Sequence, residues 1–265
     1  NEDVKAAGQE WLDTFAVGAT NGAATDKLVA ALEACGCDKA KEILAQKDFL
    51  AKKSQWIFGG DGWAYDIGFG GVDHVLASGR DINVMVFDTE VYSNTGGQSS
   101  KSTPTGAIAQ FAAGGKETKK KDMASIAMSY GYVYVAQISM GADFNQTVKA
   151  IAEAEAYPGP SLIIAYAPCI NHGMAKAQTE EELAVKVGYW HNFRFNPAAE
   201  GNKFSLDSKA PSMEDYQAFL DGEVRYNSLK RQNPEKAARL FAKNEAEAKA
   251  RFEYLQKLIA LHSAE

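Results

Sequence analysis

The stretch of sequence that decides the fold is VMVFDTEVYSNTGGQSSKSTPTGA, residues 84–107. It opens as a continuous apolar run, which is typical of a parallel strand that is buried on both faces. It then turns into a long loop of hydroxyls, amides and glycines. Such a loop buries little apolar surface, so packing does not explain its composition and we expect it to bind a polar ligand.

Three further runs have the character of strands and are separated by helical stretches. With residues 82–88, the predicted strands are 54–60, 131–139 and 160–169, and the predicted helices are 64–78, 122–130 and 143–156. This alternation predicts an α/β fold, with an open, mostly parallel, twisted sheet and helices on both of its faces. Ligands of such sheets bind at the carboxyl ends of the strands, which is where the polar loop lies.

The flanking regions are predicted to be mainly helical additions at both ends. Residues 1–50 are interpreted as a helical lead-in that belongs to the same domain, with a joint near residues 18–25. Residues 51–195 form the α/β core, and residues 196–265 form a C-terminal extension that ends in a long helix. That helix has Pro at a favourable first position, and its charged face is expected to be solvated.

A second polar turn lies at the same predicted edge of the sheet. Gly60, Asp61 and Gly62 follow the first strand, and glycine on both sides lets the backbone turn sharply close to a ligand. Thr89 ends the neighbouring strand, so the Asp61 carboxylate, the Thr89 hydroxyl and a backbone carbonyl such as that of Val91 can surround one ion. Because Mg²⁺ prefers oxygen ligands and shares them with phosphate, we expect this edge to hold a diphosphate and its Mg²⁺.

Composition and charge exclude several classes of function. The 265 residues carry a net charge of −6 and the isoelectric point is near 5.4, which argues against nucleic acid or an anionic membrane as a partner. No stretch approaches 18 uninterrupted apolar residues, and the first residues lack a signal-peptide pattern. We therefore expect a cytoplasmic protein. Because the first residue is Asn1 rather than Met, we expect either a processed start or a piece of a longer polypeptide.

The cysteines, a basic run and one histidine have less specific patterns. Three cysteines are too few and too irregularly spaced for a disulfide framework, and they indicate a reducing compartment. Cys35 and Cys37 fall one residue short of a C-x-x-C motif and are expected to be structural. The basic run at 116–122 is expected to be a solvated loop, with contact to an acidic electron carrier as the alternative. His172 is expected to be structural, with orientation of groups near a cofactor as the alternative.

Four longer phrases carry a family resemblance. They are GGDGWAYDIGFGG (59–71), FDTEVYSNTGGQSSKSTPTG (87–106), AMSYGYVYVAQ (127–137) and AYPGPSLIIAYAPCINHG (156–173). The Gly-Asp-Gly turn resembles the thiamine diphosphate motif, although most of that superfamily carries Asn-Asn where this chain has Asp88 and Thr89. This departure favours a narrower family, because the four phrases together resemble pyruvate:ferredoxin (or flavodoxin) oxidoreductase. The similarity covers most of residues 30–230 and implies a thiamine diphosphate-binding fold.

The resemblance implies roles for individual residues. Asp61, Thr89 and the Val91 carbonyl would hold Mg²⁺. Asn94 would lie near the reacting carbon of the cofactor and hydrogen-bond the substrate. Cys169 would be one of four ligands of a [4Fe–4S] cluster, the other three lying upstream of this chain. The residues implied to line thiamine diphosphate are Gly60, Asp61, Gly62, Trp63, Thr89, Glu90, Val91, Tyr92, Ser93 and Asn94.

The activity implied by the resemblance is the oxidative decarboxylation of pyruvate with coenzyme A to acetyl-CoA and CO₂. Electrons would pass through iron–sulfur clusters to ferredoxin or flavodoxin, and the other implied partners are the remaining domains of the enzyme and a second copy in a homodimer. The alternatives are a related enzyme for another 2-oxoacid and a non-catalytic scaffold or docking module. The segment alone is expected to be inactive, because the glutamate that activates the aminopyrimidine lies outside it.

Overall fold

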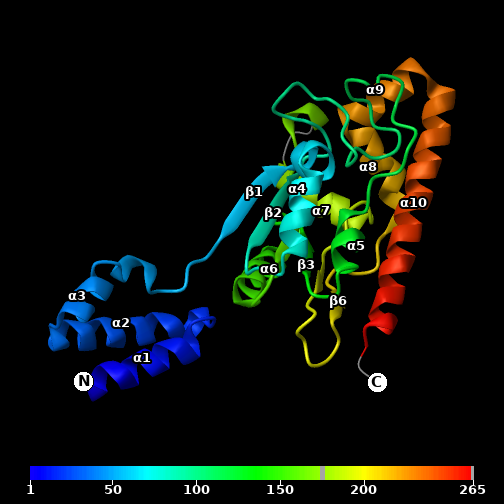
Figure 1. Ribbon diagram of the computed structural model, residues 1–265. Coiled ribbons are helices and arrows are strands. Elements are labelled where there is room, and N and C mark those ends of the chain that lie inside the picture. Colours follow the sequence, from blue (N-terminus) through cyan, green and yellow to red (C-terminus); the bar gives the residue numbers. More distant parts are fainter. Residues whose placement is uncertain (174–176, 264–265) are drawn as a thin grey trace. The chain divides into compact units, whose positions relative to one another are not determined.

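The computed structural model describes residues 1–173 and 177–263 (Figure 1). These residues form two compact units, Asn1–Gln55 and Trp56–Glu265. The division differs from the sequence analysis, which placed residues 1–50 in the same domain as the α/β core. The physical reason is that the helices of the first unit have a small core of their own, around Leu28, Leu32 and Ala40.

The first unit consists of helices α1 (Glu2–Thr14), α2 (Gly18–Cys35) and α3 (Asp38–Leu44), followed by the 3₁₀ turn η1 (Lys47–Phe49). The Asn1 side chain accepts backbone N–H groups at the start of α1, as a helix cap does. The prediction of a joint near residues 18–25 is wrong, because α2 runs through them. Their alanines are strong helix formers and outweigh the glycines.

The second unit is built on one six-stranded sheet with the order β1-β2-β4-β3-β5-β6. Its strands are β1 (Trp56–Gly60), β2 (Asn83–Asp88), β3 (Tyr134–Ile138), β4 (Ser161–Tyr166), β5 (Phe193–Phe195) and β6 (Phe204–Leu206). The first four pair in parallel, which confirms the predicted sheet. The two short strands β5 and β6 pair antiparallel and were not predicted.

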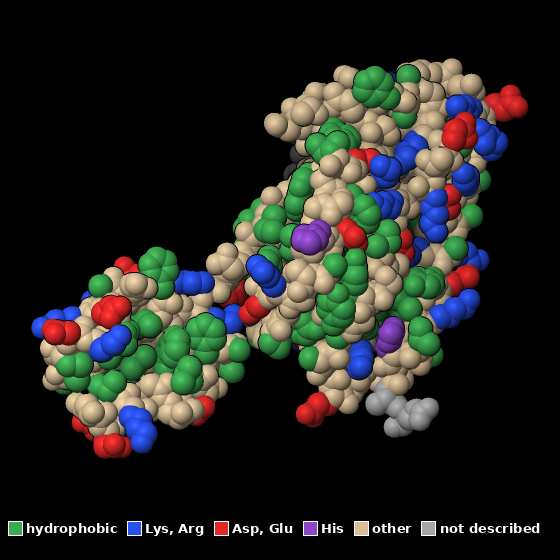
Figure 2. Space-filling model, viewed as in Figure 1, with side chains coloured by type: hydrophobic (Ala, Val, Ile, Leu, Met, Phe, Trp, Pro, Cys, Tyr) green, Lys and Arg blue, Asp and Glu red, His purple; other side chains and the backbone are tan. Residues whose placement is uncertain are grey.

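Helices cover both faces of the sheet, as predicted, and further helices follow in the C-terminal extension (Figure 1). The helical elements of the second unit are η2 (Gly62–Ile67, a π-helix), α4 (Phe69–Ala77), α5 (Met123–Met128), α6 (Phe144–Ala156), η3 (Ile170–His172), α7 (Ala177–Lys186), η4 (Met213–Asp215), α8 (Tyr216–Gly222), α9 (Val224–Gln232) and α10 (Pro234–Leu261). None of the helices in the described ranges is long and apolar enough to cross a membrane. Charged side chains of both signs line the outer surface of α10, as expected of a solvated face (Figure 2).

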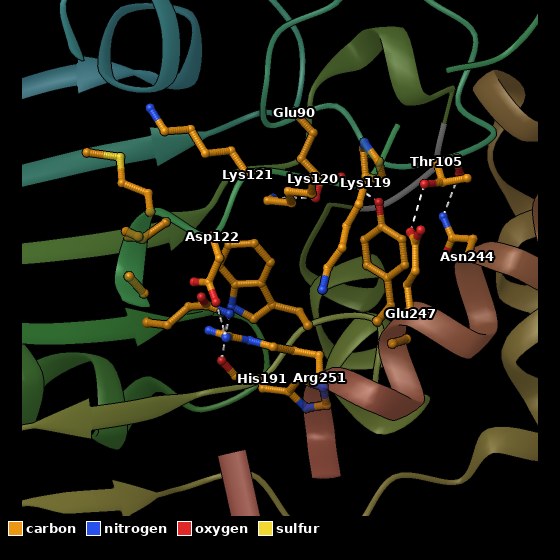
Figure 3. Close-up of a pocket in the computed structure, with 18 of the residues that line it drawn as sticks. Glu90, Thr105, Lys119, Lys120, Lys121, Asp122, His191, Asn244, Glu247 and Arg251 are labelled. Carbon is orange, nitrogen blue, oxygen red and sulfur yellow. Dashed lines mark hydrogen bonds and ion pairs between the residues drawn. The ribbon is translucent and has the colours of Figure 1, made fainter. Parts of the chain in front are cut away.

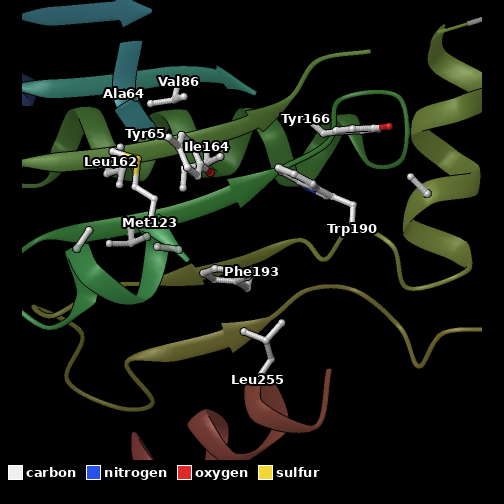
Figure 4. Packing of buried hydrophobic residues seen from close by; sticks show 14 of the residues in the cluster. Ala64, Tyr65, Val86, Met123, Leu162, Ile164, Tyr166, Trp190, Phe193 and Leu255 are labelled. Carbon is white, nitrogen blue, oxygen red and sulfur yellow. The ribbon is translucent and has the colours of Figure 1, made fainter. Parts of the chain in front are cut away.

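The core follows from the alternation of side chains along the strands. Val86 and Ile164 point to one face, where they pack with Met123 of α5 and Leu255 of α10 (Figure 4). Met85 points to the opposite face and packs in a second cluster with the alanines of α6. Both faces of the central strands are therefore buried, and only the strand ends remain for polar groups.

Candidate functional site

The carboxyl ends of β1 and β2 bring the predicted residues together. The two strands pair in parallel, with Gly60 beside Phe87, so both chains leave the sheet at the same edge. Asp61 follows β1 directly and Thr89 follows β2 directly. The Thr89 Oγ1 lies 2.9 Å from the Asp61 Oδ1, so one crossover brings together two residues that are 28 positions apart in the chain.

Three oxygen atoms converge at this point. The Thr89 hydroxyl lies within 2.9 Å of both the Asp61 carboxylate and the Val91 carbonyl oxygen. A hydroxyl has one proton, so it cannot donate fully to two acceptors at once. A carboxylate, a hydroxyl and a carbonyl that share a single proton form the kind of oxygen donor set that Mg²⁺ binds. The residues present therefore fit the predicted cation.

The protonation of Asp61 depends on its surroundings. Burial and the nearby Asp88 carboxylate raise the pKa of Asp61 to about 7, although hydrogen bonds from Ser100 and Thr89 act in the opposite direction. The Ser100 hydroxyl donates to the second carboxylate oxygen at 2.5 Å. A divalent cation beside Asp61 would favour its ionised form, so binding of a cation and loss of the proton are coupled.

The loop after β2 presents its tip outward. The backbone N–H of Tyr92 donates to the Gln98 carbonyl, and that of Gly97 donates to the Tyr92 carbonyl, both at 2.9 Å. These bonds close a compact turn in which Asn94 is exposed and Ser93 is half-buried. The predicted catalytic amide is therefore free to face a ligand at the strand ends.

Two of the glycines at this edge are required by close packing. A Cβ on Gly62 would lie 2.4 Å from the Tyr92 ring, and a Cβ on Gly59 would lie 2.2 Å from the Trp63 ring. The two aromatic residues predicted to line the cofactor thus rest directly against glycine backbone. Any larger residue at Gly62 would displace Tyr92 from its position.

Glu90, which the resemblance places along the cofactor, has its side chain directed into the interior. The carboxylate is 1% exposed and contacts Lys120 at 2.8 Å and Arg225 at 2.7 Å. Burial alone would raise the pKa of Glu90, but the two cations outweigh it and lower the pKa to about 2. Only the backbone of Glu90 is left to contact a ligand at the strand ends.

The basic run at 116–122 is not the solvated loop that was predicted. Lys120 reaches into the interior and pairs with both Asp88 and Glu90 at 2.8 Å. The Lys116 ammonium donates to the carbonyls of Ser100 and Thr103, at 2.8 and 2.6 Å. The prediction was wrong because it considered only the charge of the run, whereas two acidic side chains at the buried end of β2 require counter-charges.

A second loop connects to the same point from the end of β4. The backbone N–H of Cys169 donates to Nδ1 of His172 at 3.4 Å, so the proton of the neutral ring lies on Nε2, which donates to the Thr89 carbonyl at 2.9 Å. Burial and the nearby Arg225 lower the pKa of His172 to about 3, and the ring is neutral. His172 therefore links the predicted cluster ligand Cys169 to the predicted metal ligand Thr89.

Cys169 itself is half-buried and has a free thiol. Within residues 1–173 and 177–263, no three Cys, His, Asp or Glu side chains gather in the way that a metal site of such ligands needs. An iron–sulfur cluster at Cys169 would need its other ligands from outside the described residues.

A cavity of about 130 Å³ lies elsewhere on the molecule, between the segment 119–122 and α10 (Figure 3). Lys120 and Arg251 are among the side chains that line it, and Arg251 is paired with Asp122. Neither Asp61 nor Thr89 lines this cavity. We place the candidate site at the strand ends, because the oxygen donors converge there.

Comparisons with known proteins show the family to which the chain belongs. Residues 15–165 match the family model described as thiamine pyrophosphate enzyme, C-terminal TPP binding domain. The chain is 66% identical over 222 residues to pyruvate-flavodoxin oxidoreductase of Enterobacter agglomerans, which covers 81% of this chain and 19% of the relative. It is 64% identical over 226 residues to pyruvate:ferredoxin oxidoreductase of Moorella thermoacetica, and the match covers 83% of this chain and 19% of the relative. It is 54% identical over 267 residues to pyruvate-flavodoxin oxidoreductase of Klebsiella pneumoniae, and the match covers 97% of this chain and 23% of the relative.

The chain therefore spans about a fifth of the length of these relatives. Among solved structures, a 2-oxoglutarate:ferredoxin oxidoreductase from Magnetococcus marinus is similar with a TM-score of 0.41 and 20% identity, over 67% of this chain and 66% of that one. The fold is defined by the strand pairing described above.

Proposed function

This chain belongs to the family of thiamine pyrophosphate enzymes, in their C-terminal TPP-binding domain. From that premise we propose that Asp61, Thr89 and the Val91 carbonyl would hold the Mg²⁺ that accompanies the diphosphate of the cofactor. The observation that supports this proposal is the convergence of three oxygens around one hydroxyl proton. One or two carboxylates plus phosphate oxygens are the usual environment of Mg²⁺ beside a diphosphate.

The remaining residues of the edge have distinct roles in the proposal. The backbone of Gly60 and Gly62 would let the diphosphate approach closely, and Trp63, Tyr92 and Ser93 would line the cofactor. The exposed amide of Asn94 would hydrogen-bond the substrate and favour negative charge that develops there. Thiamine diphosphate supplies the carbanion chemistry, whereas this chain supplies binding and orientation.

For the whole protein, we propose oxidative decarboxylation of pyruvate with coenzyme A to acetyl-CoA and CO₂. The support is the high identity to relatives named as pyruvate oxidoreductases of flavodoxin or ferredoxin. Those names also support ferredoxin or flavodoxin as the electron acceptor. The proposal further includes Cys169 as one ligand of a [4Fe–4S] cluster, and a cytoplasmic homodimer. The 265 residues alone have negligible turnover in this proposal, since four fifths of the relatives' length lies outside them.

The test is the binding of thiamine diphosphate to the 265-residue chain, measured by isothermal titration calorimetry with and without Mg²⁺. In the wild type we expect binding that requires Mg²⁺, and in Asp61→Ala we expect that requirement to disappear together with most of the affinity. Glu235→Gln, an exposed carboxylate at the start of α10, is the matched control and should leave binding unchanged. Equal Mg²⁺-dependent affinity in the wild type and Asp61→Ala would contradict the proposal and favour a non-catalytic scaffold.

A further inference from the structure

Cys35 and Cys37 form a pair of thiols at the surface of the first unit. Cys35 ends α2, Gly36 forms the turn with a left-handed φ of 61°, and Cys37 precedes α3. The turn brings the two sulfur atoms to 3.4 Å from each other. The sequence alone suggested two structural thiols, but Cys37 is exposed and Cys35 is only half-buried.

The glycine between them is required by the backbone rather than by space. A Cβ on Gly36 would meet nothing within 4 Å, whereas the positive φ is strained for other residues. A left-handed residue ends α2 and reverses the chain at once, so that side chains two positions apart come to lie side by side. The proximity of the sulfurs is thus a property of the helix end and not of packing from elsewhere.

The two thiols differ in the properties that govern reactivity. The backbone N–H of Ala40 and the Cys35 thiol stabilise the thiolate of Cys37 and lower its pKa. The thiolate is the nucleophilic form, and Cys37 is also the more accessible of the two. Cys35 packs partly against the small core around Leu28 and Leu32, so it is the less accessible partner. This arrangement of an exposed attacking thiol beside a second thiol is typical of redox-responsive pairs.

We propose that Cys35 and Cys37 are a reversible dithiol–disulfide pair that reacts with small disulfides of the glutathione class. The Cys37 thiolate attacks one sulfur of the small disulfide, whose other half leaves as a thiol. The Cys35 thiol then loses its proton, attacks the mixed disulfide and releases the second half. Two protein thiols are oxidised to one disulfide, and one small disulfide is reduced to two thiols. This inference is independent of the proposed thiamine diphosphate site.

The geometry predicts that the disulfide is easily reduced. The sulfurs must approach from 3.4 Å to about 2.05 Å, and the closed loop contains a single residue. So short a loop restricts the unfolded chain little, and closing it disturbs the ends of two helices. Strained, exposed disulfides are the labile ones, in contrast with structural disulfides. We therefore expect the pair to respond to the redox state of its surroundings.

The test uses the 265-residue chain in glutathione buffers of increasing disulfide content, quenched with acid and analysed by peptide mapping and mass spectrometry. In the wild type we expect the peptide with residues 35–37 to lose two hydrogen atoms without an adduct, and to regain them in excess reduced glutathione. In Cys35→Ser we expect the reaction to stop at a glutathione adduct on Cys37. In Cys37→Ser we expect Cys35 to react about tenfold more slowly, because it is the less accessible thiol.

Two results would overturn the proposal. One is a wild-type chain that accumulates a stable glutathione adduct on Cys37, as the Cys35→Ser variant does. The other is a wild-type chain that keeps both thiols at the disulfide content that fully modifies Cys35→Ser. Circular dichroism of the three proteins checks that their helices are equally formed, so that a difference in reaction reports on the thiols alone.

Discussion

Replacement of Glu90 by Gln tests the buried charge network behind the strand ends. The wild-type carboxylate is 1% exposed and pairs with Lys120 and Arg225. These partners lower its pKa from 4.5 to about 2, a difference that corresponds to about 3 kcal/mol of stabilisation. Removal of one partner from a buried ion pair costs about 3–5 kcal/mol in other proteins, so the two magnitudes agree.

The assay is urea unfolding followed by tryptophan fluorescence, since three of the four tryptophans lie in the second unit. At pH 7 we expect Glu90→Gln to lower the free energy of unfolding by about 3 kcal/mol without a change in the urea dependence. The exposed Glu235→Gln serves as the control and should change it by less than about 0.5 kcal/mol.

The pH dependence gives a second, sharper readout. Because the folded pKa of Glu90 is lowered, its stabilisation is complete above the unfolded value of 4.5 and is lost as the pH falls towards about 2. The difference between the wild type and Glu90→Gln should therefore shrink in acid. A difference below about 0.5 kcal/mol at pH 7, or one that stays constant down to pH 2, would refute the reasoning.

Three further predictions concern the same edge of the sheet. Lys120→Met should lower the free energy of unfolding in urea by about 3 kcal/mol or more. Lys119→Met, at the exposed neighbouring lysine, should change the free energy of unfolding by less than about 0.5 kcal/mol. Equal changes in the two variants would contradict a buried charge network around Lys120. His172→Phe removes the hydrogen bond to the Thr89 carbonyl. Calorimetry should then show that the Mg²⁺-dependent affinity for thiamine diphosphate is about tenfold weaker than in the wild type. An unchanged affinity would contradict this role of His172. Because the pKa of Asp61 is raised to about 7, its proton competes with the cation below that pH. The Mg²⁺-dependent affinity for thiamine diphosphate should therefore fall about tenfold for each pH unit below 7. An affinity that does not change with pH through pH 7 would contradict Asp61 as a ligand.

Much of the sheet and the meeting of its two polar turns could be predicted from the sequence. Long apolar runs separated by helical stretches allow few topologies, and parallel pairing puts the carboxyl ends of neighbouring strands at one edge. The contact between Asp61 and Thr89 follows from that rule, and the structure places their oxygens 2.9 Å apart. By contrast, β5 and β6 contain three residues each and are too short to show a periodic pattern.

The partners of the buried acids could not be predicted in the same way. The presence of Asp88 and Glu90 at the end of a buried strand indicates that cations must lie nearby. The chain has 28 lysines and arginines, and nothing local identifies which of them are used. Lys120 is 30 residues from Glu90, and Arg225 is 135 residues from it. Such pairs are set by tertiary folding, and local patterns cannot reveal them.

The network has a physical role beyond stability, because buried ion pairs contribute little net stability compared with an apolar core of the same volume. Glu90 has a φ of 58°, a left-handed conformation that costs about 1 kcal/mol or more for a residue with a side chain. Its side chain is held from two directions, by Lys120 and by Arg225, and its carbonyl accepts the Thr103 hydroxyl. Apolar packing is not directional and would not impose one backbone conformation so strictly. Because Thr89 and Val91 flank Glu90, contacts that hold Glu90 in place also restrict the backbone that carries the Thr89 hydroxyl and the Val91 carbonyl, the two oxygens that lie 2.9 Å apart.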